Sequence, residues 1–234
     1  MSRSVFVVED HPLMAEGIRN VIERATDLEL AGTAGSTGEA LDAILGKEPD
    51  VVVSDLALPD GSGLELMKRV QTASPEQRFV ILSVYAESVY AERALRAGAS
   101  GYVMKEAASE TLLEAVRTVL RGDMYISPAL RERLVQRLIA APGRKPDQDQ
   151  LDLLSDRELE VYRMIGTGYS RSEIAEALHI SPKTVESYRA KIKEKMGFRN
   201  ASEMMQHAVA WRLDQPRGES AEAMNGNAPA THGR

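Results

Sequence analysis

The chain has 234 residues, a formal net charge of −6 and no cysteine. This length favours two domains over one compact core, and the absence of cysteine excludes disulfide bonds and thiol chemistry. No apolar run approaches the ~20 residues of a membrane-spanning helix, and the charged pair Glu9-Asp10 comes too early for a signal peptide. We therefore expect a cytoplasmic protein without a membrane partner.

Charge is distributed unevenly along the sequence. Residues 1–122 carry 12 basic and 19 acidic residues, a net charge of −7. Residues 151–213 carry 10 basic and 9 acidic residues, a net charge of +1, and 183–199 carry 6 and 2, a net charge of +4. Different partners for the two halves are therefore expected. A basic segment can contact nucleic acid, although a solvated helix face is the simpler interpretation of charge alone.

Residues 1–122 alternate between short apolar runs and amphipathic stretches. The apolar runs predict strands at 4–8, 28–32, 51–53, 79–82 and 101–104. The amphipathic stretches predict helices at 12–25, 37–47, 63–73, 87–97 and 109–121. Strict alternation of strand and helix favours an α/β fold, a doubly wound five-stranded parallel sheet with helices on both faces.

The rest of the chain predicts a linker, a small all-α domain and a tail. We expect residues 123–152 to be a linker with one helix at 128–140, because 141–150 are polar and contain two prolines and a glycine. Residues 153–213 predict a helical domain. After it the hydrophobic pattern is lost, so 214–234 are expected to be a disordered tail.

Four helices are expected in the second domain. Ser155 and Glu158 form a capping box for a helix that ends near Ile165. A helix at 171–178 follows Ser170, and Ser181-Pro182 are a good start for a third helix. The fourth is expected at 202–213.

The second and third of these helices, joined by a tight turn, predict a helix-turn-helix. The third helix has an apolar side, with Val185, Tyr188, Ile192 and Met196. Its other side is polar, with Lys183, Glu186, Ser187, Ala190 and Lys191. We expect the apolar side to pack on the domain and the polar side to enter a DNA major groove.

Polar side chains follow four of the predicted strands. Glu9-Asp10 come after the first strand, Asp55 after the third, Ser83 after the fourth and Lys105 after the fifth. The carboxyl ends of parallel strands meet in one crevice. Clustered carboxylates suit Mg2+, and an ammonium and a hydroxyl can hold phosphoryl oxygens. A lone Asp55 would more often be a turn or cap residue, but this combination predicts a nucleophile that becomes an aspartyl phosphate.

Specific motifs surround these residues and the predicted DNA-contacting helices. In the first half they are Val8-Glu9-Asp10-His11-Pro12, the segment 54–63 with Pro59-Asp60-Gly61, and Gly101-Tyr102-Val103-Met104-Lys105. In the second half they are Leu154-Ser155-x-Arg157-Glu158, Ser172-Glu173-Ile174-Ala175 and Ser181-x-Lys183-Thr184-Val185-Glu186. The first half resembles the receiver domain of two-component response regulators, and the second resembles the LuxR-type helix-turn-helix. Together, over about 3–122 and 153–213, they resemble the NarL/FixJ group of transcription factors.

The resemblance implies a flavodoxin-like receiver in which Asp55 accepts phosphate from a sensor histidine kinase. Mg2+ would be held by Glu9, Asp10, Asp55 and the backbone carbonyl of Ala57. Ser83, which stands where a threonine is commoner, and Lys105 would contact the phosphoryl group, and Tyr102 would move with Ser83. His11 is interpreted as a helix-entry residue, with kinase contact as the alternative.

The resemblance also implies binding to double-stranded promoter DNA as a homodimer once the protein is phosphorylated. Lys183, Thr184 and Lys191 would lie near phosphates, and Glu186, Ser187 and Ala190 would face base edges. Glu186 could instead pair with Arg189 or Lys191 and orient that cation. The dimer would form through 202–213 and its residues Met204, Met205, Ala208 and Val209, although Met204, Met205 and Trp211 also fit a core. RNA polymerase is a further candidate partner.

Two other classes of protein remain as alternatives. A phosphatase that forms an aspartyl phosphate usually has a second acid two residues after its nucleophile, where this chain has Ala57. A protein-binding regulator that never takes phosphate would not need the acidic pair, Asp55 and Lys105 together. The sequence therefore favours a phosphorylation-activated DNA-binding transcriptional regulator. Its enzymatic chemistry would be limited to Mg2+-dependent self-phosphorylation and autodephosphorylation at Asp55.

Overall fold

The computed structural model describes residues 2–85, 87–107, 109–139, 151, 153–178 and 180–214. Contacts divide the chain into two compact units, Met1–Pro146 and Asp147–Arg234. The predicted tail, apart from Asp214, lies outside the described residues, as does the 141–150 part of the predicted linker. Within the described parts of the chain, no helix is both long enough and apolar enough to cross a membrane.

The first unit is built on a five-stranded parallel sheet, as the sequence predicts. The strands are β1 (Arg3–Val8), β2 (Leu28–Ala34), β3 (Val51–Asp55), β6 (Phe79–Ser83) and β7 (Gly101–Met104). Their order in the sheet is β2-β1-β3-β6-β7, and every neighbouring pair is parallel. The central strands β3 and β6 are buried along their whole length. Burial on both faces explains why they are continuous apolar runs rather than alternating ones.

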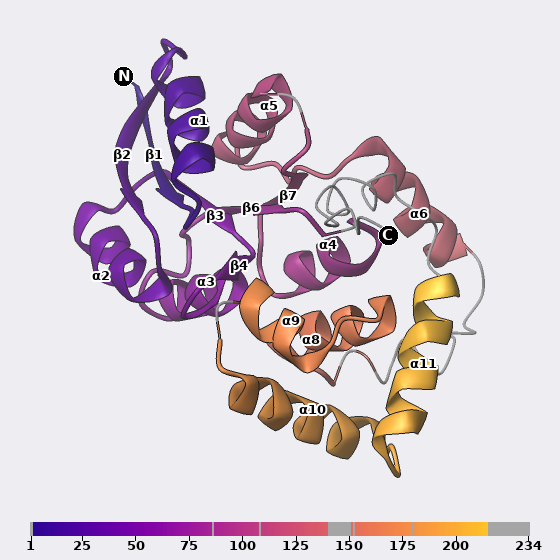
Figure 1. Cartoon of the computed structure of the whole chain (residues 1–234). Helices are drawn as coiled ribbons and strands as arrows, with labels where there is room; N and C mark the ends of the chain where they lie inside the picture. Colours follow the sequence, from indigo (N-terminus) through magenta and orange to yellow (C-terminus); the bar gives the residue numbers. More distant parts are fainter. Residues whose placement is uncertain are drawn as a thin grey trace, which may run out of the picture. The chain divides into compact units, whose positions relative to one another are not determined.

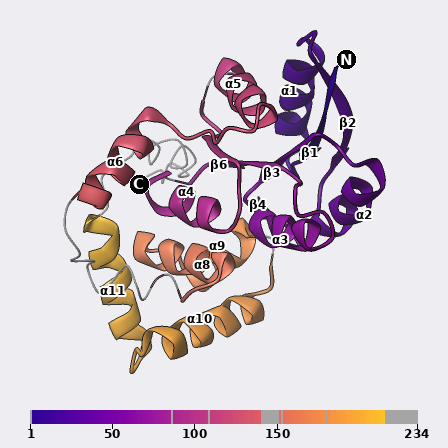
Figure 2. The same cartoon turned by 180° about the vertical axis from the view of Figure 1, so that it is seen from behind.

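Helices cover both faces of the sheet (Figures 1 and 2). They are α1 (Pro12–Glu23), α2 (Thr37–Lys47), α3 (Gly63–Ala73), α4 (Glu87–Arg96) and α5 (Ser109–Leu120). α1 and α5 lie on one face and pack against each other, and α2, α3 and α4 lie on the other. This arrangement confirms the doubly wound α/β fold.

A short hairpin occupies the segment that contains Pro59-Asp60-Gly61, directly after β3. Ala57–Leu58 (β4) pairs antiparallel with Gly61–Ser62 (β5). Glycine is required directly after it, because a Cβ on Gly63 would lie 2.1 Å from the carbonyl oxygen of Asp55. At the tip of the hairpin, the Asp60 carboxylate accepts hydrogen bonds from the Thr37 and Gly38 N–H groups at the start of α2, at 2.7 and 2.9 Å. The hairpin thus ties the end of β3 to α2.

The first part of the predicted linker is attached to the edge of the sheet. The Tyr102 N–H in β7 donates to the Tyr125 carbonyl at 3.2 Å, and the Tyr125 N–H donates to the Ser100 carbonyl at 2.9 Å. Ser127 then accepts from the Leu130 N–H at 3.0 Å and so caps α6 (Pro128–Ile139). The linker helix therefore begins as part of the first unit.

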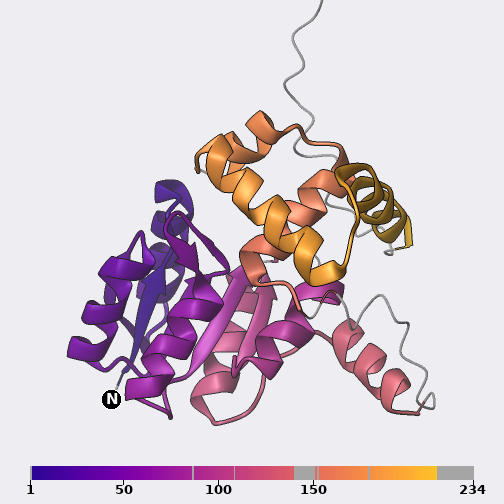
Figure 3. The ribbon, with the colours of Figure 1, turned by 90° about the horizontal axis from the view of Figure 1, so that it is seen from below.

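The described part of the second unit includes the helices α8 (Asp156–Thr167), α9 (Arg171–Ala177), α10 (Pro182–Met196) and α11 (Ala201–Asp214) (Figure 3). Capping boxes start α8 and α9, with Ser155 and Ser170 as the N-caps. Ser181 caps α10 by accepting from the Thr184 N–H at 3.0 Å. Both α10 and α11 pack on α8. The predicted helix-turn-helix is therefore α9 and α10.

Candidate functional site

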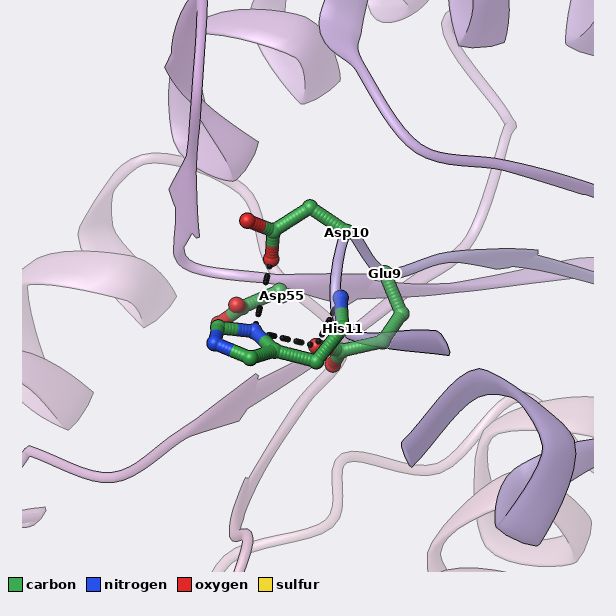
Figure 4. A group of neighbouring side chains, drawn as sticks. All are labelled: Glu9, Asp10, His11 and Asp55. Atoms are coloured by element: carbon green, nitrogen blue, oxygen red, sulfur yellow. Dashed lines mark hydrogen bonds and ion pairs between the residues drawn. The ribbon is translucent and has the colours of Figure 1, made fainter. Parts of the chain in front are cut away.

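Acidic and basic side chains meet at the carboxyl ends of β1, β3 and β7. Figure 4 shows the acidic ones together with His11. Asp55 ends β3, Glu9 and Asp10 follow β1, and Lys105 follows β7. The Lys105 ammonium donates to Asp55 Oδ2 at 2.8 Å and lies 2.7 Å from Glu9 Oε2. The exposed fractions of the Glu9, Asp55 and Lys105 side chains are 0%, 7% and 6%. The structure therefore brings together the four charged residues that the strand ends predict.

Burial and charge act against each other in this pocket. Burial raises the pKa of Asp55 to about 6, Lys105 opposes the rise and the Glu9 carboxylate adds to it. Burial lowers the pKa of Lys105, but the Asp55 and Glu9 carboxylates outweigh it, so the net change is a raised pKa. With three carboxylates and one ammonium ionised, the cluster of Glu9, Asp10, Asp55 and Lys105 has a net charge of −2. This charge matches a divalent cation.

The donor atoms of the pocket also fit one cation. Glu9, Asp10, His11 and Asp55 each offer one ligand atom, and these atoms lie within 4.8 Å of one another. Carboxylate oxygens are the ligands that Mg2+ prefers. The Ala57 N–H donates to Asp55 Oδ1 at 3.2 Å, which places Ala57 beside the pocket. Its carbonyl as a ligand stays a prediction.

Ser83 and Tyr102 are joined through a residue that sequence analysis missed. The buried Ser83 hydroxyl, at the end of β6, accepts from the Tyr85 N–H at 3.0 Å. The Tyr102 hydroxyl, on the neighbouring strand β7, donates to the Tyr85 carbonyl at 2.8 Å. Burial raises the pKa of Tyr102, which is only 1% exposed. Only the backbone of Tyr85 takes part, so no residue-type signal could have identified it.

The polar face of α10 is exposed as predicted. Lys183, Glu186, Ser187, Ala190 and Lys191 are exposed and Thr184 is half-buried, whereas Val185, Ile192 and Met196 are buried. Glu186 Oε1 lies 3.6 Å from Arg189 Nη1 and 4.0 Å from Arg171 Nη1. The structure therefore contains the Glu186–Arg189 pair that was the alternative to base contact, and adds Arg171 from α9.

Burial separates the four predicted dimer residues into two pairs. Met204 and Ala208 are fully buried, and the Ala208 backbone lies against Gly166 of α8. Met205 and Val209 have exposed fractions of 49% and 39%. Met204 and Ala208 therefore pack in the core of the second unit, on the side of α11 that contacts α8, and the role of the predicted set in a dimer stays a prediction.

Comparison with known proteins identifies both halves. Residues 5–117 match the response regulator receiver domain, and residues 152–208 match the bacterial regulatory proteins of the luxR family. The oxygen regulatory protein NreC of Staphylococcus carnosus is 34% identical over 212 residues, which cover 89% of this chain and 98% of that protein.

Solved structures show the same relationship. A LuxR-family two-component response regulator from Aurantimonas sp. is 31% identical, with a TM-score of 0.56 over 59% of this chain and 99% of that chain. The response regulator RcsB of Salmonella typhimurium is 26% identical, with a TM-score of 0.52 over 89% of this chain and 100% of that one. The chain therefore belongs to the two-component response regulators of the NarL group, which join a receiver domain to a LuxR-type DNA-binding domain.

Proposed function

We propose that Asp55 accepts a phosphoryl group from a sensor histidine kinase and that phosphorylation promotes binding of the second unit to promoter DNA as a dimer. The observation that carries this proposal is the buried Asp55 carboxylate, held by Lys105 beside two further carboxylates. We take 1–122 as the receiver domain, 123–152 as the linker and 153–213 as the DNA-binding domain. A cytoplasmic location and contact with RNA polymerase are part of the same proposal.

The chemistry is a phosphoryl transfer between two nucleophiles. A carboxylate oxygen of Asp55 forms the new P–O bond while the P–N bond to the kinase histidine breaks, and the bonding electron pair returns to the histidine nitrogen. Lys105 and the Ser83 hydroxyl would donate to the phosphoryl oxygens. Glu9, Asp10, Asp55 and the Ala57 carbonyl would hold Mg2+, which when bound neutralises charge on the transferring group. Attack by water on the acyl phosphate would return free Asp55 and inorganic phosphate.

The first test is labelling of the full chain with acetyl phosphate and Mg2+, followed by intact mass. The wild type should gain one phosphoryl group. Asp55→Asn should gain none, and neither should the double variant Glu9→Gln with Asp10→Asn. Asp60→Asn is the matched control, because Asp60 is exposed and caps α2. It should react as the wild type does. Full labelling of Asp55→Asn would refute the assignment.

The bond network around Tyr85 gives the proposed switch a physical route. A phosphoryl group on Asp55 would draw the Ser83 hydroxyl away from the Tyr85 N–H, and the Tyr85 carbonyl holds the Tyr102 hydroxyl. Phosphorylation of Asp55 would thereby change the position of the Tyr102 ring beside α4. The surface around this ring would be a two-state element of the kind that a modification can bias. Ser83→Ala should still accept phosphate but gain little DNA affinity from it. A wild-type gain in that variant would exclude this route.

For DNA, we propose that Glu186 positions Arg171 and Arg189 for phosphate contact rather than reading a base. Binding-site selection with wild type and Glu186→Ala decides between these roles. Unchanged preferred sequences with weaker binding support positioning. A relaxed preference at one base pair, worth about 1–3 kcal/mol, would establish base contact by Glu186 instead.

Lys183 and Lys191 provide a comparison within α10. As phosphate contacts, each should weaken binding to all sequences about equally when replaced by alanine. Each loss should also reduce the slope of binding against salt by about one. A sequence-dependent loss for either lysine would argue against a phosphate contact.

The dimer contact is proposed to involve the exposed side of α11. Met205, Val209 and Leu213 follow one another at intervals of four residues and are exposed, the last by 73%. Met205→Glu combined with Val209→Glu should keep the acetyl phosphate-treated protein monomeric in sedimentation. Gln206→Glu, an exposed neighbour off this side, should dimerise normally. The preferred DNA should then contain two half-sites about one helical turn apart.

A further inference from the structure

The imidazole of His11 contacts the carboxylates of the acidic pocket and does not cap the helix that it precedes. His11 is the N-cap residue of α1, with extended backbone angles, and Pro12 follows at the first helical position. Among the described residues, none in the first turn of α1 donates to the His11 side chain. Instead, Nδ1 lies 2.9 Å from Asp10 Oδ1 and 3.2 Å from Glu9 Oε1. Figure 4 shows the ring turned toward these carboxylates, with Asp55 close by.

We propose that His11 is an additional ligand of the divalent cation and adapts this site to Mn2+ or a similar transition-metal ion in preference to Mg2+. The inference rests on the proposed function, because it concerns the cation that supports phosphorylation of Asp55. A site made of oxygen ligands alone suits Mg2+, whereas imidazole nitrogen favours first-row transition metals.

The spacing of the donor atoms supports a shared ion. In an octahedral shell with bonds of about 2.1 Å, adjacent donors lie about 3 Å apart and opposite donors about 4.2 Å apart. The distances from His11 Nδ1 to Asp10 and Glu9 match adjacent positions, and the donor atoms of all four residues, with Asp55, lie within 4.8 Å. The ring therefore needs no large movement to join the same coordination shell.

The chemistry of the ring is compatible with this role. A neutral imidazole carries one hydrogen, on either nitrogen. Without a cation, a hydrogen on Nδ1 can donate to the Asp10 and Glu9 carboxylates. With the hydrogen on Nε2, the Nδ1 lone pair is available to a cation among the three carboxylates. Because 67% of the His11 side chain is exposed, water can carry the ring hydrogen from one nitrogen to the other when the tautomer changes. Mg2+ binds imidazole weakly, so His11 would not coordinate it.

The experiment measures binding of each cation alone to the full chain by titration calorimetry. The variants are His11→Ala and His11→Asn, with Leu13→Ala as the matched control, because Leu13 is 90% exposed two residues away. Affinity for Mn2+ should fall by about tenfold or more in both His11 variants, while affinity for Mg2+ changes by less than about threefold. Leu13→Ala should bind both ions as the wild type does.

Pulsed electron paramagnetic resonance of bound Mn2+ provides a readout independent of affinity. The wild type should show coupling to a nitrogen nucleus, and His11→Ala should lose it. A wild-type spectrum without nitrogen coupling, or equal losses of Mg2+ and Mn2+ affinity in His11→Ala, overturns the inference. If instead Asp55→Asn and Asp10→Asn bind both ions as tightly as the wild type, this pocket is not the cation site, and the proposed function fails as well.

Discussion

Replacing Asp55 by asparagine should stabilise the first unit, because the ionised carboxylate opposes folding. Its pKa is about 6 in the folded protein against an ordinary value of 3.8. A group whose folded pKa is raised contributes stability that is present below the unfolded pKa and lost as pH rises through the folded pKa. Here that window runs from 3.8 to about 6. The difference between these two pKa values corresponds to about 3 kcal/mol at pH values above the window.

The expected gain therefore depends on pH. By linkage, ionisation of the buried Asp55 carboxyl costs folding about 1–2 kcal/mol at pH 5 and about 3 kcal/mol at pH 8, and asparagine avoids this cost at both pH values. The gain of Asp55→Asn should accordingly be larger at pH 8 than at pH 5 by about 1–2 kcal/mol. The amide oxygen can still accept from Lys105, so the variant keeps a partner for the ammonium.

The assay is urea unfolding of the full chain in EDTA, with β3 (Val51–Asp55) followed by a short deuterium-labelling pulse and mass spectrometry. Mg2+ added afterwards should stabilise the wild type and not Asp55→Asn, because a cation that binds only the folded pocket raises its stability by mass action. A pH-independent difference between the two proteins, or a less stable Asp55→Asn at pH 8, would refute the argument that burial dominates.

Asp60→Asn provides a control of the opposite sign in the same unit. Burial raises the pKa of Asp60, but hydrogen bonds from the Thr37 and Gly38 N–H groups outweigh it, so the net pKa is lowered. A lowered folded pKa contributes stability that is present above the unfolded pKa and lost as pH falls through the folded one. Asp60→Asn should therefore destabilise the unit more at pH 8 than at acid pH. The same sign of pH dependence for Asp55→Asn and Asp60→Asn would show that one of the two assignments is wrong.

Substitutions at three positions test local packing and capping. Gly63→Ala should destabilise the first unit by at least about 3 kcal/mol in urea, because the new Cβ would meet the backbone carbonyl of Asp55 at 2.1 Å; a loss below about 1 kcal/mol would contradict this contact. Gly166→Ala should destabilise the second unit, measured by tryptophan fluorescence, because its Cβ would lie 2.5 Å from the Ala208 carbonyl oxygen. Ser181→Ala should cost about 1 kcal/mol in the same assay through loss of the α10 cap, and Ser181→Asn should largely restore it.

The sequence predicts the pocket well because its charged residues stand at strand ends. Once β1, β3, β6 and β7 are parallel neighbours, their carboxyl ends must converge. Helix starts were equally readable, since Ser155, Ser170 and Ser181 are strong N-caps and each accepts from a backbone N–H three residues on.

The sequence was less informative where the orientation of a side chain or of the backbone determines a residue's burial or contacts. α11 has apolar residues on two sides, so periodicity could not separate the buried Met204 from the exposed Met205. The β4–β5 hairpin has strands of two residues, too short for any periodic pattern. Tyr85 acts through its backbone, and the place of His11 in the pocket depends on its rotamer, which no spacing rule fixes.

Several features of the acidic pocket are unfavourable for folding, and bound ligands would offset all of them. His11 gives up side-chain capping of α1, Glu9 and Asp55 are buried as carboxylates, and the cluster keeps a net charge of −2 after pairing with Lys105. Each feature costs stability in the isolated protein, whereas Ser155, Ser170 and Ser181 cap their helices as expected. A bound divalent cation would neutralise the charge, and a phosphoryl group would engage the ammonium and the Ser83 hydroxyl. The buried, unbalanced charge in this pocket therefore supports the proposal that ligand binding, rather than folding, supplies the interactions that these side chains lack.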